Sequence, residues 1–192
     1  MTRGLVLLRH GATDWNAAGR LQGRADIGLS DAGRAAFAGC SVPAAYRDRQ
    51  WYVSPLRRTQ ETAALLGLAP RIEPALIEMD WGQYEGRTLP ELRAAYGDAF
   101  TANEDRGLDL QPPDGESPRQ VQQRLLPWLS SLPGDAGAIA HKGVIRAILA
   151  MAFDWPMLGR APVKLDWHCL QEFSITDDGR PTLVAANVPL ER

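Results

Sequence analysis

The chain has 192 residues, of which 45% are apolar and 23% are charged, and its formal net charge is −2. This length and composition predict one globular domain with a core of ordinary size and at most a small cap. The charge provides no global basic field for nucleic acid or anionic lipid, and no apolar run approaches the ~20 residues of a membrane span.

The first half of the chain is predicted to alternate between strands and helices. Ser30 is expected to cap one helix, and Ser54-Pro55 combines an N-cap with a proline at the first position of another. The expected elements are a buried central strand over 4–8, a polar loop over 11–29, a helix over 31–38, a strand over 51–53, a helix that Gly67 closes, and an extended segment over 71–77.

The second half continues this alternation after a polar stretch. Ser117-Pro118 repeats the cap-plus-proline signal, and Asp177-Asp178-Gly179 suits the turn of a hairpin. The expected elements are an aromatic loop over 80–88, a helix over 89–96, a surface excursion over 103–116, helices over 118–130 and 143–153, and strands over 137–140, 168–176 and 182–186.

This order predicts an α/β fold: a three-layer sandwich whose mostly parallel central sheet is flanked by helices, with a lid-like insertion. We expect a single domain over 1–192, in which the excursion over 78–117 is a lid that selects the substrate. His10 and His141 each follow a predicted buried strand. Ligands gather at the carboxyl ends of strands in such sheets, so we expect both histidines in one site.

The residues at these strand ends suit a phosphate monoester. Arg9 and Arg58 each offer a fork of donors to phosphoryl oxygens, and a helix start at Arg58 also favours an anion. An unprotonated Nε2 of His10 can attack phosphorus and form a phosphohistidine, which divides one displacement into two. Surrounding positive charge keeps His10 neutral, and a cationic His141 would share the developing charge.

An alkoxide leaving group also needs a proton donor. Glu78 enters an aromatic stretch, where a partly dry environment would raise the pKa of a carboxyl group to the level that a general acid needs. Asp80 and Glu85 lie in the same loop, and the residue types alone do not separate the three candidates.

Six blocks of the sequence carry these residues in a fixed order. They are Arg9-His10-Gly11 continuing to Asn16, Gln22-Gly23 to Ser30, Ser54 to Arg58, Glu78 to Gly86, Pro113 to Ser117, and His141 to Arg146. In this order they resemble the histidine phosphatase superfamily, also called the phosphoglycerate mutase-like family, over nearly the whole chain. Any one tripeptide is weak evidence, whereas six ordered blocks are specific.

The resemblance implies phosphoryl transfer through a phosphohistidine, without a metal or another cofactor. It assigns catalytic roles to residues from four of the blocks, namely Arg9, His10, Arg58, Glu78 and His141. Within that alignment Glu78 is the proton donor. Asn16 and the backbone of Gln22-Gly23 would line the pocket.

Two positions depart from the family's pattern. Ala12 stands where many members carry Glu, which removes a charge near the pocket mouth. Lys142 stands where glycine is common. Its side chain would either contact a second anionic group of the substrate or point into solvent, and we favour the second alternative. Tyr84 is a further candidate for substrate contact, with packing as the favoured alternative.

We therefore expect a phosphomonoesterase that acts on a small phosphorylated metabolite. Alternatives with the same chemistry are an α-ribazole-5'-phosphate phosphatase specifically and a phosphoglycerate mutase, although resembling mutases are longer. A non-catalytic module that binds phosphorylated ligands is more distant, because all the expected catalytic residues are present. A metal hydrolase using His10, His141 and His168 is more distant still, because their spacing fits no metal motif.

The expected partner is a small phosphorylated substrate, without nucleic acid or membrane, and the sequence leaves a homodimer open. A strand expected from Gly4 leaves no room for a signal peptide, so we expect a cytoplasmic protein. Cys40 and Cys169, which are far apart in the sequence, are expected to be unpaired thiols in a reducing compartment.

Overall fold

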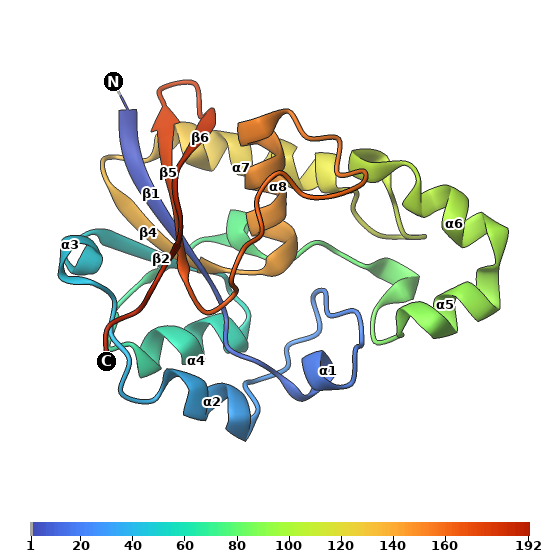
Figure 1. Ribbon diagram of the computed structural model, residues 1–192, viewed down its shortest axis with the longest axis horizontal. Helices are drawn as coiled ribbons and strands as arrows, with labels where there is room; N and C mark the ends of the chain where they lie inside the picture. Colours follow the sequence, from blue (N-terminus) through green and yellow to red (C-terminus); the bar gives the residue numbers. More distant parts are fainter. Residues whose placement is uncertain (1) are drawn as a thin grey trace.

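A mixed sheet runs through the computed structural model, which describes residues 2–192 (Figure 1). The strands are β1 (Thr2–Arg9), β2 (Gln50–Val53), β3 (Arg71–Ile72), β4 (Ala136–Ala140), β5 (Leu170–Thr176) and β6 (Pro181–Val188). Their order in the described chain is β3-β2-β4-β1-β5-β6. The first four are parallel neighbours, whereas β5 is antiparallel to both β1 and β6. The predicted α/β class with a mostly parallel sheet is confirmed.

Helices cover both faces of this sheet. They are α1 (Asp14–Ala17), α2 (Asp31–Phe37), α3 (Ala44–Arg47), α4 (Arg57–Leu65), α5 (Leu89–Tyr96), α6 (Asp98–Glu104), α7 (Pro118–Ser131) and α8 (Lys142–Phe153), with 3-10 turns η1 (Pro74–Leu76), η2 (Gly82–Tyr84) and η3 (Gly107–Asp109). Figure 1 shows α7 and α8 on one side of the sheet and α2 and α4 on the other. This arrangement is the predicted three-layer sandwich.

The central strand β1 is apolar at consecutive positions because both of its faces are covered. Side chains alternate along a strand, so Leu5 and Leu7 pack with apolar residues of α7 and α8. Val6 and Leu8 pack in the opposite cluster, which includes residues of α2, α3 and α4. The two clusters bury both faces of β1, and this packing fixes the position of the residues that follow it.

Two of the predicted helix starts are confirmed by their caps. The Ser30 hydroxyl accepts from the backbone N–H of Gly33 at 3.1 Å, and Ser117 forms a capping box with Gln120. The start predicted at Ser54-Pro55 is wrong, because α4 begins at Arg57 with Leu56 as its N-cap. The Ser54 hydroxyl instead contacts His141, so it serves the strand edge rather than the helix.

Two other segments contain more helix than the sequence predicted. The stretch 71–77 is a strand only at β3, because the Glu73 carboxylate accepts from the N–H of Ala75 at 2.9 Å and Pro74 starts η1. The excursion 103–116 contains the end of α6 and the turn η3. Gly97 separates α6 from α5 with a positive φ of 51°, a conformation that glycine adopts easily.

The helices α5 and α6 form a cap that projects away from the sheet in Figure 1. The cap has its own small core of Tyr84, Leu92 and Phe100. Both ends of the segment 78–117 are tied to Arg24, which pairs with Asp80 at 3.2 Å and with Glu116 at 3.2 Å. The role of this segment as a lid stays a prediction.

Three neighbouring parallel strands bring polar residues together at their carboxyl ends. His10 follows β1, Ser54 follows β2, and His141 follows β4. The registers of β1 and β2 with β4 place these strand ends level with one another. Elsewhere, Cys40 and Cys169 are free thiols, and none of the helices within residues 2–192 has the length and apolar character to cross a membrane.

Candidate active site

The ring of His10 is oriented by a hydrogen bond to its own turn. Its Nδ1 lies 2.7 Å from the carbonyl oxygen of Gly11, and the residue is 6% exposed. A carbonyl oxygen only accepts, so Nδ1 carries the hydrogen and Nε2 keeps its lone pair. Burial, followed by the charges of Arg9 and Arg58, holds the pKa of His10 well below its ordinary value. A neutral ring with a free Nε2 is the form that can act as a nucleophile.

His141 lies beside His10, with 5.1 Å between the ring centroids. Its Nδ1 accepts from Nε of Arg58 at 3.2 Å, and its Nε2 lies 2.8 Å from the Ser54 hydroxyl. Because an arginine only donates, Nδ1 is unprotonated and Nε2 is the donor to Ser54. Burial, followed by His10 and Arg58, holds the pKa of His141 well below its ordinary value. The ring is neutral here, whereas the role considered from the sequence is that of a cationic form.

Arg58 is fully buried and is oriented entirely by neutral groups. Its two terminal nitrogens donate to the carbonyl oxygens of Ala25 at 2.9 Å and of Gly23 at 2.7 Å, while its Nε donates to His141. Burial is the main cause that lowers the pKa of Arg58 to about 10. The guanidinium group is thus held in place without a carboxylate within ion-pair distance, although the charges of Glu78, Asp26 and Glu85 act on it from further away. Such a group can bind an anion.

Glu85 holds the loop that orients Arg58. Its carboxylate accepts from the backbone N–H groups of Arg24, at 3.0 Å, and of Ala25. Gly23 leaves room for this contact, because a Cβ there would lie 2.7 Å from Oε2 of Glu85. Asp80 is also engaged, since it accepts from the N–H of Gly82 at 2.8 Å and pairs with Arg24. Both rivals of Glu78 therefore hold backbone segments in place.

Glu78 is in a different environment from these two carboxylates. It is 5% exposed and accepts from the N–H groups of Met79 at 2.8 Å and Gly143 at 3.1 Å. Burial raises its pKa, although the two backbone hydrogen bonds and the nearby arginines act in the opposite direction. Gly143 is required beside it, because a Cβ at that position would overlap Oε1 of Glu78. A buried carboxyl group with a raised pKa suits a proton donor.

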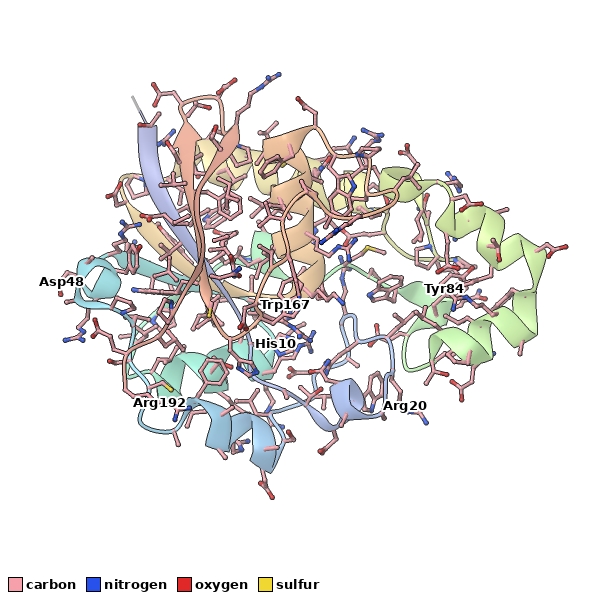
Figure 2. The ribbon with its side chains drawn as sticks, viewed as in Figure 1. His10, Arg20, Asp48, Tyr84, Trp167 and Arg192 are labelled. Carbon is pink, nitrogen blue, oxygen red and sulfur yellow. The ribbon has the colours of Figure 1, made fainter. Side chains whose placement is uncertain are left out.

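Arg9 and Lys142 share one indole ring. Cζ of Arg9 lies 5.6 Å from the ring centroid of Trp167, and Nζ of Lys142 lies 5.7 Å from it. Trp167, labelled in Figure 2, lies on the segment that precedes β5. Lys142 is an exposed residue, as the favoured solvent alternative requires. However, its ammonium group also lies over the indole ring of Trp167.

Asn16 and Gln22 form one polar network with Thr13. Oε1 of Gln22 accepts from the Thr13 hydroxyl at 3.0 Å and from Nδ2 of Asn16 at 3.4 Å. Oδ1 of Asn16 in turn accepts from the N–H of Thr13 at 3.0 Å, within the capping box of α1. Nε2 of Gln22 is buried and has no hydrogen-bond partner among residues 2–192. That amide is a donor available to a ligand oxygen.

Two residues considered from the sequence lie apart from this cluster. The ring of Tyr84 is buried in the cap, 5.5 Å from the ring of Tyr96 and 5.4 Å from that of Phe100 (Figure 2). It occupies a packing position, which was the favoured alternative. His168 is exposed and lies 5.8 Å from the ring of Phe37.

The five expected catalytic residues lie together in the structure. The charges of Arg9 and Arg58 act on His10, His141 and Glu78 alike, which places all five in one electrostatic environment. The set contains a neutral imidazole with a free nitrogen, two guanidinium groups and a buried acid. Such a set can attack phosphorus, hold its oxygens and protonate a leaving oxygen.

The chain matches the family model described as "Histidine phosphatase superfamily (branch 1)" over residues 5–189. This protein belongs to the histidine phosphatase superfamily. A relative named glucosyl-3-phosphoglycerate phosphatase, from Mycolicibacterium vanbaalenii, is 36% identical over 179 residues that cover 82% of this chain and 79% of the relative. A 2,3-bisphosphoglycerate-dependent phosphoglycerate mutase from Azorhizobium caulinodans is 33% identical and covers 78% of this chain and 81% of its own.

A solved structure agrees with this family membership. Mycobacterial glucosyl-3-phosphoglycerate phosphatase in complex with VO3 superposes with a TM-score of 0.77 at 29% identity, covering 97% of this chain and 99% of that one. Together the family and its phosphatase-named members support a hydrolase of the phosphomonoesterase class. The resemblance inferred from the six sequence blocks is confirmed.

Sequence reasoning did not assign three residues that shape this site. Ser54 was interpreted as a helix cap, although a hydroxyl directly after a strand next to two other polar strand ends was a usable signal. Glu85 was weighed only as an acid, whereas a glycine-rich loop nearby could have indicated a carboxylate that binds backbone N–H groups. Trp167 gave no signal, because its loop has no periodicity that would place it near Arg9.

Proposed function

We propose that this protein hydrolyses phosphate monoesters of small metabolites by two displacements at phosphorus, with His10 as the nucleophile and Glu78 as the proton donor. The observation that carries the proposal is the hydrogen bond between Nδ1 of His10 and the Gly11 carbonyl, which leaves Nε2 unprotonated beside two arginines. The buried Glu78, with its raised pKa, supports the second role.

In the first displacement, Nε2 of His10 forms a bond to phosphorus while the bond from phosphorus to the alcohol oxygen breaks. Glu78 gives its proton to that oxygen, so the alcohol leaves neutral. In the second displacement a water molecule attacks phosphorus, Glu78 takes a proton from it, and the nitrogen–phosphorus bond breaks. Orthophosphate leaves, and both side chains return to their starting forms.

Arg9 and Arg58 hold the phosphoryl oxygens during both steps, because charge develops there. A dianion beside His141 favours the protonated imidazole. We therefore propose that His141 takes up a proton from solvent at Nδ1 as the substrate binds. This breaks the hydrogen bond that Nδ1 accepts from Nε of Arg58 and leaves both N–H groups free to donate to the phosphoryl oxygens, so His141 then joins the two arginines. This links the neutral ring of the structure to the cationic role that the sequence suggested. Calorimetric titration with orthophosphate in buffers of different ionisation enthalpy measures this uptake, which His141→Asn removes.

Hydrolysis of p-nitrophenyl phosphate in the presence of EDTA tests the main proposal. The wild type should be fully active, and His10→Ala should lose activity by about 10⁴-fold or more, as expected for removal of a nucleophile. Acid-labile phosphate should be trapped on residue 10 of the wild type during turnover. Activity that survives His10→Ala would end the assignment.

A phosphoglycerate mutase is the second candidate, because several relatives carry that name at 32–38% identity. A mutase would return the phosphoryl group from His10 to another hydroxyl of the same molecule rather than to water. Interconversion of phosphoglycerates, measured with and without bisphosphoglycerate, separates the two activities. Release of orthophosphate at a rate far above interconversion supports the hydrolase.

Turnover measurements are needed to identify the physiological substrate. Relatives named glucosyl-3-phosphoglycerate phosphatase make that compound one test substrate, and α-ribazole-5'-phosphate remains another. A turnover screen over phosphorylated metabolites ranks them. A cytoplasmic location and a homodimer stay predictions, which fractionation and size measurement in solution would check.

A further inference from the structure

A row of positive charge continues from the phosphate pocket along α8. Lys142 begins this helix, and Arg146 lies one turn further on the same side. Nζ of Lys142 lies 5.7 Å from the ring centroid of Trp167, and Cζ of Arg146 lies 5.1 Å from that of Trp155. Because Arg9 also contacts Trp167, the row and the pocket share one indole ring.

These cations lack the partners that most arginines of this protein have. Within residues 2–192, no carboxylate lies within ion-pair distance of Arg9, Lys142 or Arg146, whereas Glu or Asp partners are found for arginines elsewhere, including Arg24, Arg34, Arg49, Arg93, Arg119 and Arg124. Nε of Arg9 and Nε of Arg146 are buried without any hydrogen-bond partner in the described chain. Unpartnered buried donors are costly unless a ligand uses them.

Two carboxylates that could balance this charge already accept backbone hydrogen bonds. Glu78 acts on the charge of Lys142, but its two oxygens accept from the backbone of Met79 and Gly143. Asp166, next to Trp167, accepts from the N–H of His168 at 2.9 Å. Burial, followed by the charges of Arg146 and Arg9, lowers the pKa of Lys142. The row therefore carries a surplus of positive charge.

We propose that Lys142 and Arg146 form a subsite for a second anionic group of the substrate, beside the phosphoryl group that is transferred. The proposal rests on the hydrolase function proposed above. Lys142 directly follows His141 and shares Trp167 with Arg9, so the second anion would lie only a few bonds from the phosphoester. The backbone positions of the two cations are about 6 Å apart along the helix axis. The substrate class is then a small phosphorylated acid or a small bisphosphate.

The two indole rings explain how flexible side chains can serve such a subsite. A lysine or arginine free in solvent loses much rotamer freedom when it binds a ligand. Contact with the faces of Trp167 and Trp155 already restricts Lys142 and Arg146, while leaving their donors unused. Binding of an anion then requires less additional ordering.

Paired inhibitors of p-nitrophenyl phosphate hydrolysis test this subsite. 3-Phosphoglycerate and glycerol 3-phosphate share a phosphoester and differ by a carboxylate in place of a hydroxymethyl group. Fructose 1,6-bisphosphate and fructose 6-phosphate differ by a second phosphate. In the wild type we expect the inhibition constant of the more anionic member to be about tenfold lower in at least one pair, as one charged contact is worth. The pair with the larger ratio identifies the second anion as carboxylate or phosphate.

Variants show whether Lys142 and Arg146 cause the difference between the inhibition constants. The double variant Lys142→Gln/Arg146→Gln should reduce the ratio of the two inhibition constants in a pair to about two or less. The single variant Lys142→Arg keeps the positive charge and should retain the wild-type ratio. Arg71→Gln, which removes an exposed charge on the edge strand β3, is the matched control and should retain the ratio. Raising the ionic strength should shrink the wild-type ratio, because salt screens the contact.

Two results would overturn the subsite. One is a ratio near one for both pairs in the wild type, and the other is a ratio that the double variant leaves unchanged. Either result leaves the proposed hydrolase intact, since p-nitrophenyl phosphate is still turned over. Absence of that turnover in the wild type would contradict the hydrolase itself.

Discussion

Arginines serve opposite purposes in the cap region and in the pocket. In and around the cap, Arg24, Arg93, Arg119 and Arg124 each lie within ion-pair distance of a carboxylate. At the edge of the sheet, Arg9 and Arg58 have no carboxylate partner within the described residues, and Arg58 is oriented by two carbonyl oxygens and an imidazole. The first set joins segments of the protein, and the second set is left ready for an anion.

This difference has an energetic meaning. Burying a charge without a counter-charge is unfavourable, and the pKa of Arg58, lowered to about 10, reports that cost. Neutral acceptors keep the guanidinium group in position without cancelling its charge. The buried charge thus costs stability at the pocket, and under the proposed function a phosphate dianion would restore that stability by binding. The following predictions test whether the two regions behave in these opposite ways.

Arg58→Gln should have the largest effect on activity among these variants. We expect kcat/KM for p-nitrophenyl phosphate to fall by about 10³-fold, because the variant loses the buried charge that we propose contacts the phosphoryl oxygens. Arg58→Lys should not restore the wild-type value, since an ammonium group cannot reach both the Gly23 and Ala25 carbonyls in the same fork. Steady-state kinetics, with circular dichroism to verify folding, provide the measurement. A loss below tenfold would contradict the role given to the pocket.

Glu78→Gln should affect poor leaving groups far more than good ones. An alkoxide needs a proton as it leaves and p-nitrophenolate does not, so we expect about a 10²-fold loss with an alkyl phosphate and less than about tenfold with p-nitrophenyl phosphate. The raised pKa of Glu78 means that the acid form is lost as pH rises through that pKa. Wild-type activity on alkyl phosphates should therefore decrease on the alkaline side, and the variant should lack this limb. Equal losses for both substrates would exclude Glu78 as the donor.

The pocket histidines should make stability depend on pH. Their pKa values are held well below the ordinary value, so the unfolded chain binds protons near pH 6.5 that the folded chain does not. The free energy of unfolding is then greatest above that pH and falls as the pH decreases, by up to about 1.4 kcal/mol per pH unit for each histidine.

Urea unfolding of the wild type and of His141→Asn between pH 7 and pH 5 measures this slope. The difference between the two proteins isolates the histidine, because the opposite contribution of Glu78, whose raised pKa favours the folded chain at low pH, is present in both. His168→Asn is the matched control at an exposed position outside the pocket. Parallel curves for the wild type and His141→Asn would show that the folded protein binds the proton after all.

Arg93→Gln should have the smallest effect and defines the other side of the comparison. Arg93 pairs with Glu104 at 3.1 Å, and their side chains are 55% and 30% exposed. Such a surface pair contributes about 0–1 kcal/mol to stability. We expect the melting temperature to fall by a few degrees at most and kcat/KM to stay within about twofold of the wild type. A large loss of activity would connect the cap to catalysis through this pair.

The fold was predictable wherever local signals and tertiary packing agree. The apolar run of β1 is buried on both faces, and the caps at Ser30 and Ser117 start helices as their residue types suggest. The start at Ser54 was wrong because tertiary structure gave its hydroxyl to His141, which no local pattern reveals. The helix α6 was missed because its amphipathic pattern is short and its core belongs to the cap alone.

The candidate site likewise has features that the sequence predicted and features that it did not. The histidines and arginines were identified by the order of their blocks, and Glu78 was separated from its rivals by the family alignment rather than by its own residue type. The charge state of His141 depends on a donor from Arg58, which is distant in sequence. The position of Lys142 over Trp167 depends on the path of a loop. Such contacts join residues that are distant in sequence, so local sequence patterns cannot predict them.

Gly143 has one further consequence. Its backbone N–H binds Glu78, and its missing side chain makes room for that carboxylate at the start of α8. A single peptide unit therefore sets the spacing between Glu78 and the helix that follows His141. Neither can be shifted on its own in a redesign, because a Cβ at Gly143 would overlap Oε1 of Glu78.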